Sequence, residues 1–78
     1  MNDTATGTKI NPMTMDKDYD LVSVIYHSLQ AVEVCGRYRD DAERAGSQDI
    51  AQFMDQVKQQ NNQIAQRAKA LLLQQRQA

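Results

Sequence analysis

Hydrophobic residues recur in alternating steps of four and three in the C-terminal part of the chain. The stripe consists of Ile50, Met54, Val57, Asn61, Ile64, Ala68 and Leu71. Since an α-helix has 3.6 residues per turn, this spacing keeps the stripe on one helix face, turned toward a partner helix. The same segment is rich in Ala, Gln, Lys and Arg, which are good helix formers. The pattern therefore predicts a helix over about residues 48–75.

A second helical pattern, over about residues 18–45, has a wider hydrophobic surface. Its central stripe consists of Leu21, Ile25, Val32, Cys35 and Ala42, with Val22, Leu29 and Gly36 on one flank and Val24, Ala31, Val34 and Tyr38 on the other. One antiparallel neighbour cannot cover so wide a surface, so we expect this helix to contact at least two others and to contribute most of a dimer seam. Gly36 is unfavourable in a helix, and we interpret it as a point where another helix approaches closely.

Short polar segments indicate where these helices begin and end. Aspartates between residues 16 and 20 suit a helix start, because their carboxylates accept hydrogen bonds from free backbone N–H groups. Gly46 suits the left-handed position after a helix, and Ser47 suits the start of the next one. We interpret residues 1–16 as a flexible tail and residues 17–78 as an antiparallel hairpin. Because two helices cannot surround a core, the predicted fold is all-α, a hairpin that dimerises into a four-helix bundle.

The two stripes also predict how the hairpin is paired. Aligning Ala42 with Ile50 and stepping by heptads places Cys35 near Val57, Ser28 near Ile64 and Leu21 near Leu71. Asn61 is the polar member of its stripe, and we interpret it as fixing register and oligomer number at some expense of stability. The predicted core and dimer seam consists of Leu21, Val22, Ile25, Leu29, Val32, Cys35, Gly36, Ile50, Met54, Val57, Asn61, Ile64, Ala68 and Leu71.

Length, cysteine content and charge narrow the class of protein. A chain of 78 residues with a single cysteine, Cys35, has no internal disulfide to stabilise a small core. Cys35 is interpreted as a small buried residue in a reducing compartment, and no stretch of about 20 apolar residues predicts a membrane span, so we expect a cytoplasmic protein. The formal net charge is −1, and after Gln56 there are four basic residues, Lys58, Arg67, Lys69 and Arg76, and no acidic one. We expect them to balance the aspartates at the start of the first helix, with no nucleic-acid or membrane partner.

The polar residues form no recognisable catalytic motif. There is no glycine-rich phosphate loop and no Cys-x-x-Cys pair. Ser23 has His27 four residues on as a base, but no acidic residue at helical spacing completes a catalytic triad. We therefore predict no catalytic, cofactor or metal residues. One alternative is a weak iron or manganese site formed by His27 and Glu33 in a symmetric dimer. These two residues are six positions apart, about 120° around a helix, whereas a ferritin-type site needs Glu-x-x-His on one face.

Part of the chain, from Tyr19 to Leu73, resembles small bacterial ferritin-like helical-hairpin proteins. The residues that carry the resemblance are Tyr19–Gln30, Glu33, Tyr38, Asp41–Glu43, Ala45–Gly46, Phe53, Val57, Asn61 and Ala68–Leu72. The resemblance implies half of a ferritin-like four-helix bundle, completed by dimerisation. It does not bring the activity with it, because the metal-binding motif is missing, and His27 and Glu33 are the only residues that could be proposed as vestigial ligands.

These observations lead to three functional hypotheses. The first is a non-enzymatic structural or interaction module that forms a homodimer. The second is a ferritin-like metal-binding protein or oxidase with a degenerate site. The third is a hairpin whose first helix docks on a larger, unidentified protein.

Overall fold

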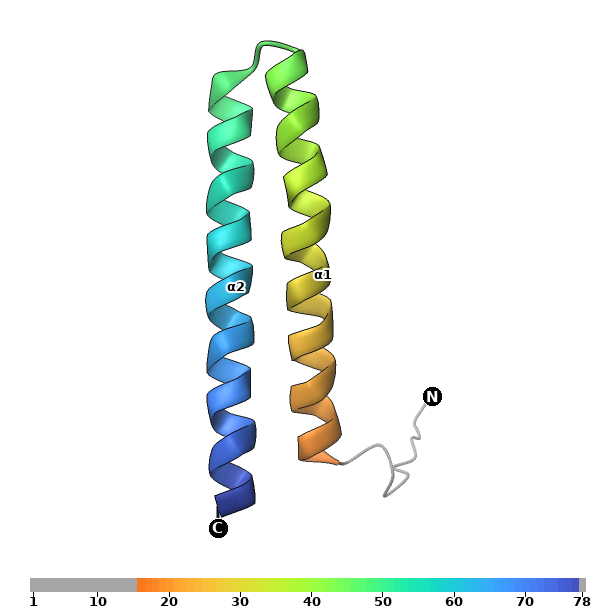
Figure 1. Cartoon of the computed structure of the whole chain (residues 1–78), viewed down its shortest axis with the longest axis vertical. Helices are drawn as coiled ribbons and strands as arrows, with labels where there is room; N and C mark the ends of the chain where they lie inside the picture. Colours follow the sequence, from red (N-terminus) through yellow and green to blue (C-terminus); the bar gives the residue numbers. More distant parts are fainter. Residues whose placement is uncertain (1–15, 78) are drawn as a thin grey trace, which may run out of the picture.

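The computed structural model describes residues 16–77, with side chains up to residue 75, as two antiparallel helices joined by a tight loop (Figure 1). Helix α1 spans Lys17–Arg44 and helix α2 spans Gln48–Gln77. The prediction of an all-α helical hairpin is confirmed, and each observed helix end lies within two residues of its predicted position. The predicted tail lies outside the described residues except for Asp16. No helix within the described part of the chain is long and apolar enough to cross a lipid bilayer.

Local sequence signals determine where both helices stop and start. The Asp16 carboxylate accepts hydrogen bonds from the backbone N–H groups of Asp18 at 3.0 Å and Tyr19 at 3.1 Å, as a helix cap should. At the loop, Gly46 has a φ of 75°, a backbone conformation that a side chain would strain. The Ser47 N–H donates to the Ala42 carbonyl at 2.9 Å, which completes the capping pattern of a glycine-terminated helix. The predicted turn at Gly46 is therefore confirmed.

Small side chains fill the seam between the two helices. The buried residues are Ser28, Cys35 and Ala42 on α1 and Ala51, Ala65 and Ala68 on α2. No large side chain is fully buried among the described residues. Short side chains let two helix axes approach closely, so this seam brings the helices together while burying little hydrophobic surface.

At two positions the seam of α2 is one residue out of step with the prediction. Ala51 is 1% exposed and Ala65 is 0% exposed, whereas Ile50 and Ile64 are each 48% exposed. The predicted pairing of Ile50 with Ala42 and of Ile64 with Ser28 is therefore wrong for the hairpin. Turning the alanines inward moves the isoleucines to the flank of the seam, because consecutive helix residues are 100° apart.

Gly36 does not mark a close approach between α1 and α2. A Cβ atom at this position would have only the Lys58 Nζ atom nearby, at 3.9 Å, which is ordinary contact. We therefore expect Gly36→Ala to raise the free energy of unfolding by about 1 kcal/mol, the difference in helix propensity. Urea unfolding of the two proteins measures this difference. A destabilised variant would show that another helix packs directly on Gly36.

Candidate interaction surface

One side of the hairpin carries a row of hydrophobic side chains, all but one of them large, which we call the apolar face. It consists of Val24, Ala31 and Tyr38 on α1 and Ile50, Phe53, Val57, Ile64 and Leu71 on α2. Residues seven apart lie on nearly the same side of a helix, so each set forms one stripe. Phe53 is three turns from Ile64 and lies close to the same line. Val24, Ile64 and Leu71 line one groove together, which places the two stripes on the same side of the hairpin.

Most of this apolar face is open to solvent. Tyr38 is 49% exposed, Phe53 is 56% exposed, and Val24, Ile50 and Ile64 are exposed to a similar degree. Single exposed hydrophobic residues are common in soluble proteins, but a contiguous row marks a site of interaction. The row also lacks the lysine and glutamate residues that flank the seam of a solvent-facing helix. The apolar face is therefore the candidate functional surface of the hairpin.

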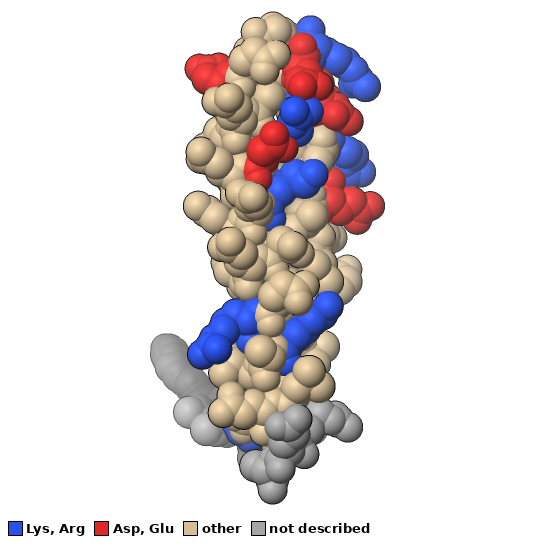
Figure 2. Space-filling model, turned by 60° about the vertical axis from the view of Figure 1, so that its left-hand side comes forward, with Lys and Arg blue, Asp and Glu red and all other residues tan. Residues whose placement is uncertain are grey.

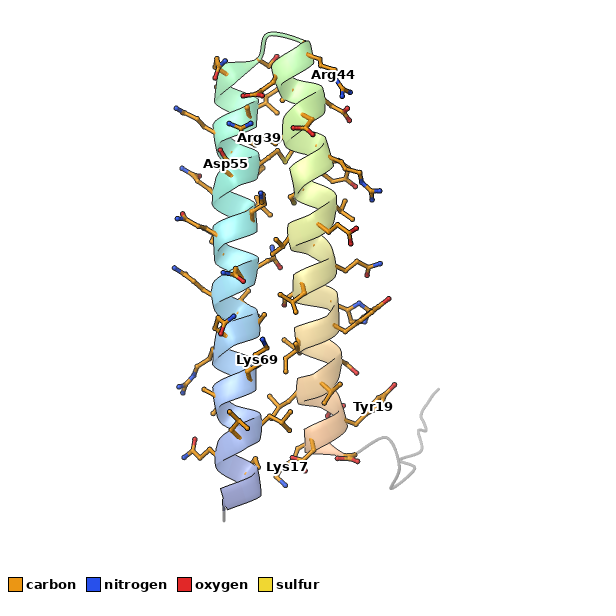
Figure 3. All side chains as sticks on the ribbon, in the orientation of Figure 1. Lys17, Tyr19, Arg39, Arg44, Asp55 and Lys69 are labelled. Atoms are coloured by element: carbon orange, nitrogen blue, oxygen red, sulfur yellow. The ribbon has the colours of Figure 1, made fainter. Side chains whose placement is uncertain are left out.

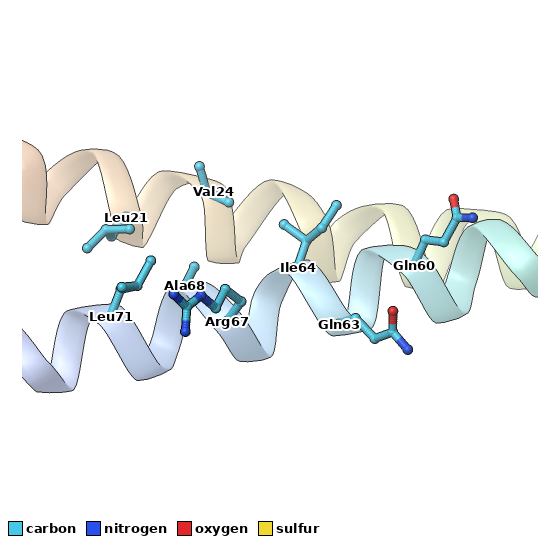
Figure 4. Close-up of a pocket in the computed structure, with 8 residues that line it drawn as sticks. All are labelled: Leu21, Val24, Gln60, Gln63, Ile64, Arg67, Ala68 and Leu71. Carbon is cyan, nitrogen blue, oxygen red and sulfur yellow. The ribbon is translucent and has the colours of Figure 1, made fainter.

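A groove hollows the apolar face in its half far from the loop. The groove has a volume of about 570 Å³ and is lined by Leu21 and Val24 of α1 and by Gln60, Gln63, Ile64, Arg67, Ala68 and Leu71 of α2 (Figure 4). Its floor is low because Ala68 has a short side chain and is buried in the seam. Arg67 is the one charged residue that lines it. The groove can hold a hydrophobic side chain, with Arg67 at its rim.

The opposite side of the hairpin, which we call the charged face, has ion pairs near the loop and the exposed side chains of Val22 and Leu29 farther from it. Arg39 bridges the helices: its Nε atom is 2.8 Å from Asp55 Oδ2, and its Nη1 atom is 2.9 Å from Glu43 Oε2 (Figure 3). The hydrogen bond from Arg39 to Asp55, together with the negative charges of Asp55 and Glu43, raises the pKa of Arg39 above its ordinary value. The Arg39 guanidinium is charged at all physiological pH values, as an arginine is in any protein, so these ion pairs depend on Asp55 and Glu43 being ionised.

Charge is distributed unevenly along the hairpin. Figure 2 shows acidic and basic side chains together near the loop and a band of basic side chains alone in its lower part. Asp49 and Asp55 lie in the first third of α2, whereas Arg67 and Lys69 lie further along. Helix α2 therefore has an acidic start and a basic second half.

The residues predicted to form the seam are divided between the hairpin interior and its surface. Cys35 and Ala68 are buried; Leu21, Ile25, Val32, Gly36, Met54, Val57, Asn61 and Leu71 are partly buried; Val22, Leu29, Ile50 and Ile64 are exposed. Asn61 does not bond across the seam, because its Nδ2 atom donates to the Val57 carbonyl of its own helix at 2.9 Å. Sequence reasoning missed Ala51 and Ala65. Their signal is a second four-three stripe that shares Ala68 with the hydrophobic one and has the small residues Ala51 and Ala65 in place of Ile50 and Ile64.

Among the described residues, no third metal-binding side chain joins His27 and Glu33, the two residues considered for metal binding. His27 and Glu33 are both exposed on α1, and the His27 ring packs edge-on against Tyr26 with 5.3 Å between ring centroids. Within residues 16–75, no group of three or more histidine, cysteine or acidic side chains is arranged to hold a metal ion. A site with these two residues would therefore need donors from a second molecule.

Because comparison with known proteins finds no relative, any proposal of function rests on the residues of the chain itself. No protein-family model, no curated protein and no solved structure matches the chain. The resemblance to ferritin-like hairpins therefore stays a prediction, and the fold that the structure establishes is an all-α helical hairpin.

Proposed function

We propose that the chain is a non-enzymatic structural or interaction module that acts as a homodimer, a four-helix bundle made of two hairpins. The observation that carries this proposal is the division of side chains by size. The buried seam contains alanine, serine and cysteine, while the large hydrophobic residues of the apolar face are exposed. In a hairpin of this kind, the large hydrophobic side chains, whose burial would contribute most to stability, remain exposed.

The energetics favour a partner over a free hairpin. Burying one Ile, Val or Phe side chain contributes about 1.5–3 kcal/mol, several times the contribution of an alanine methyl group. The apolar face offers several such side chains on each copy. Chains of this size reach only marginal stability from one small core, and this chain has no disulfide to add to it.

The partner we propose is a second copy of the same chain. A two-fold dimer brings the same surface of both copies together, so a single self-complementary face is enough to build it. The resulting bundle agrees with the half-bundle that the resemblance to ferritin-like hairpins implies. A lone cysteine, Cys35, buried in the seam, fits a reducing compartment such as the cytoplasm.

Native mass and metal content, measured in one session on untagged protein purified without chelator, test the proposal. We expect a dimer at low micromolar concentration with no stoichiometric metal. A well-folded monomer would contradict self-association and favour docking on a larger protein. A dimer carrying near-stoichiometric iron or manganese would contradict the non-enzymatic reading and direct attention to His27 and Glu33.

A further inference from the structure

We propose that the groove on the apolar face receives Tyr38 and Phe53 of a second copy, so that the two hairpins pair with their loops at opposite ends. This inference rests on the proposed self-association and specifies its geometry. The residues that carry it lie in the two halves of the apolar face, which differ in shape.

The half near the loop is raised and the other half is hollow. Tyr38 and Phe53 are the aromatic residues of the apolar face, and about half of each side chain is exposed. Both lie within about three turns of the loop at Gly46. The groove lies in the other half, between Leu21 and Val24 of α1 and the Ile64–Leu71 segment of α2. One face thus contains both a bulky aromatic pair and a recess.

Symmetry then distinguishes two possible dimers. With the two-fold axis parallel to the helices, both loops lie at the same end, the aromatic pairs face each other and the two grooves enclose an unfilled space. With the axis perpendicular to the helices and in the plane of the interface, each aromatic pair faces the groove of the other copy. Protein interiors are packed to a density that leaves few voids, so the second arrangement is favoured.

Spacing and charge along α2 agree with this arrangement. Phe53 and Arg67 are each seven residues from Gln60, so an axis near Gln60 brings Phe53 of one copy to Arg67 of the other. An arginine guanidinium is attracted to the face of an aromatic ring. On α1, Ala31 is likewise midway between Val24 and Tyr38. An axis near this small residue brings Tyr38 of one copy opposite the smaller Val24 of the other.

The same axis makes α2 antiparallel to its copy. The acidic start of one α2, with Asp49, then runs beside the segment of the other that contains Arg67, whereas Asp55 and Lys69 lie on the side of α2 turned away from this interface. Opposite charges near an interface favour one register over others.

The apolar face is also large enough for a dimer. From Ile50 to Leu71 it extends about 32 Å, at 1.5 Å per residue, and two helices give it a width of about 20 Å. Its area of about 600 Å² is close to the roughly 800 Å² that each partner contributes to a standard protein interface.

Spin-label distances test the orientation of the loops. Gln48→Cys, in a Cys35→Ser background that first has its native mass checked, places one label beside each loop. We expect a distance of about 36 Å or more, since the two labels lie 24 residue rises apart along the bundle. A distance near 20 Å would put both loops at one end and overturn the inference. Gln60→Cys is the matched control, with a short distance expected because Gln60 lies near the axis.

Alanine substitutions test which side chains enter the groove. Phe53→Ala should raise the dimer dissociation constant at least tenfold, whereas Leu73→Ala, at an exposed position off the apolar face, should leave it nearly unchanged. Equal effects would contradict the groove as the site of Phe53. If the unsubstituted protein is a folded monomer, the proposed function fails with the inference. If it is a dimer with adjacent loops, only the inference fails.

Discussion

Replacing Ala65 with Leu should lower the free energy of unfolding by about 3 kcal/mol, although both residues are good helix formers. Ala65 has no exposed surface and lies in the middle of the seam between α1 and α2. Three additional carbon atoms have no space there, so the helices must move apart or the side chain must take a strained rotamer. A marginally stable hairpin would lose a large part of its stability.

Thermal or urea unfolding at fixed protein concentration measures this loss. The matched control is Ala70→Leu, which makes the same chemical change on the same helix at an exposed position. We expect Ala70→Leu to change the free energy of unfolding by less than about 0.5 kcal/mol. Equal stability of the two variants would show that α1 and α2 do not pack closely through Ala65.

Replacing Ile64 with Asp should weaken self-association at least a hundredfold. Ile64 is about half exposed in the hairpin and lines the groove of the apolar face, so the hairpin itself tolerates a polar residue there. In a two-fold dimer the change occurs twice, and each copy loses about 1.5–3 kcal/mol of hydrophobic burial and gains a carboxylate that must be desolvated. A total of about 3 kcal/mol already corresponds to a hundredfold change in the dissociation constant.

Sedimentation equilibrium over a range of protein concentrations measures this constant. Gln66→Asp is the matched control, because it adds the same charge two residues away, at an exposed position outside the groove lining. We expect the control to dimerise like the unsubstituted protein. Equal weakening by both variants would indicate a general effect of charge, and no weakening by Ile64→Asp would exclude the apolar face as the dimer interface.

The helices and their ends could be predicted because they depend on residues close together in the sequence. Asp16 caps the first helix with its own carboxylate, and Gly46 takes a positive φ without a steric penalty. Hydrophobic periodicity over more than 20 residues then identified each helix as one continuous element. These signals need no information about the partner helix.

The candidate surface could be predicted only in part. The unusual width of the hydrophobic surface on α1 indicated that one neighbour was not enough, and the exposed Val22, Val24, Leu29 and Tyr38 agree with that indication. The location of the continuous apolar face was not predicted, because α2 was expected to turn Ile50 and Ile64 toward α1. The groove was not predicted either, since it forms between two helices and has no counterpart in the sequence of one.

The amino-acid sequence was enough to specify two helices, the loop between them and a surplus of hydrophobic surface, since helix propensity, capping and the 3.6-residue period are local properties. The three-dimensional packing decided which stripe of α2 turns toward α1. Close approach of two helix axes selects the small residues Ala51 and Ala65 over the more hydrophobic Ile50 and Ile64 next to them. A rotation of α2 by less than one residue thereby moved the large side chains to the surface of the hairpin, where α1 does not cover them.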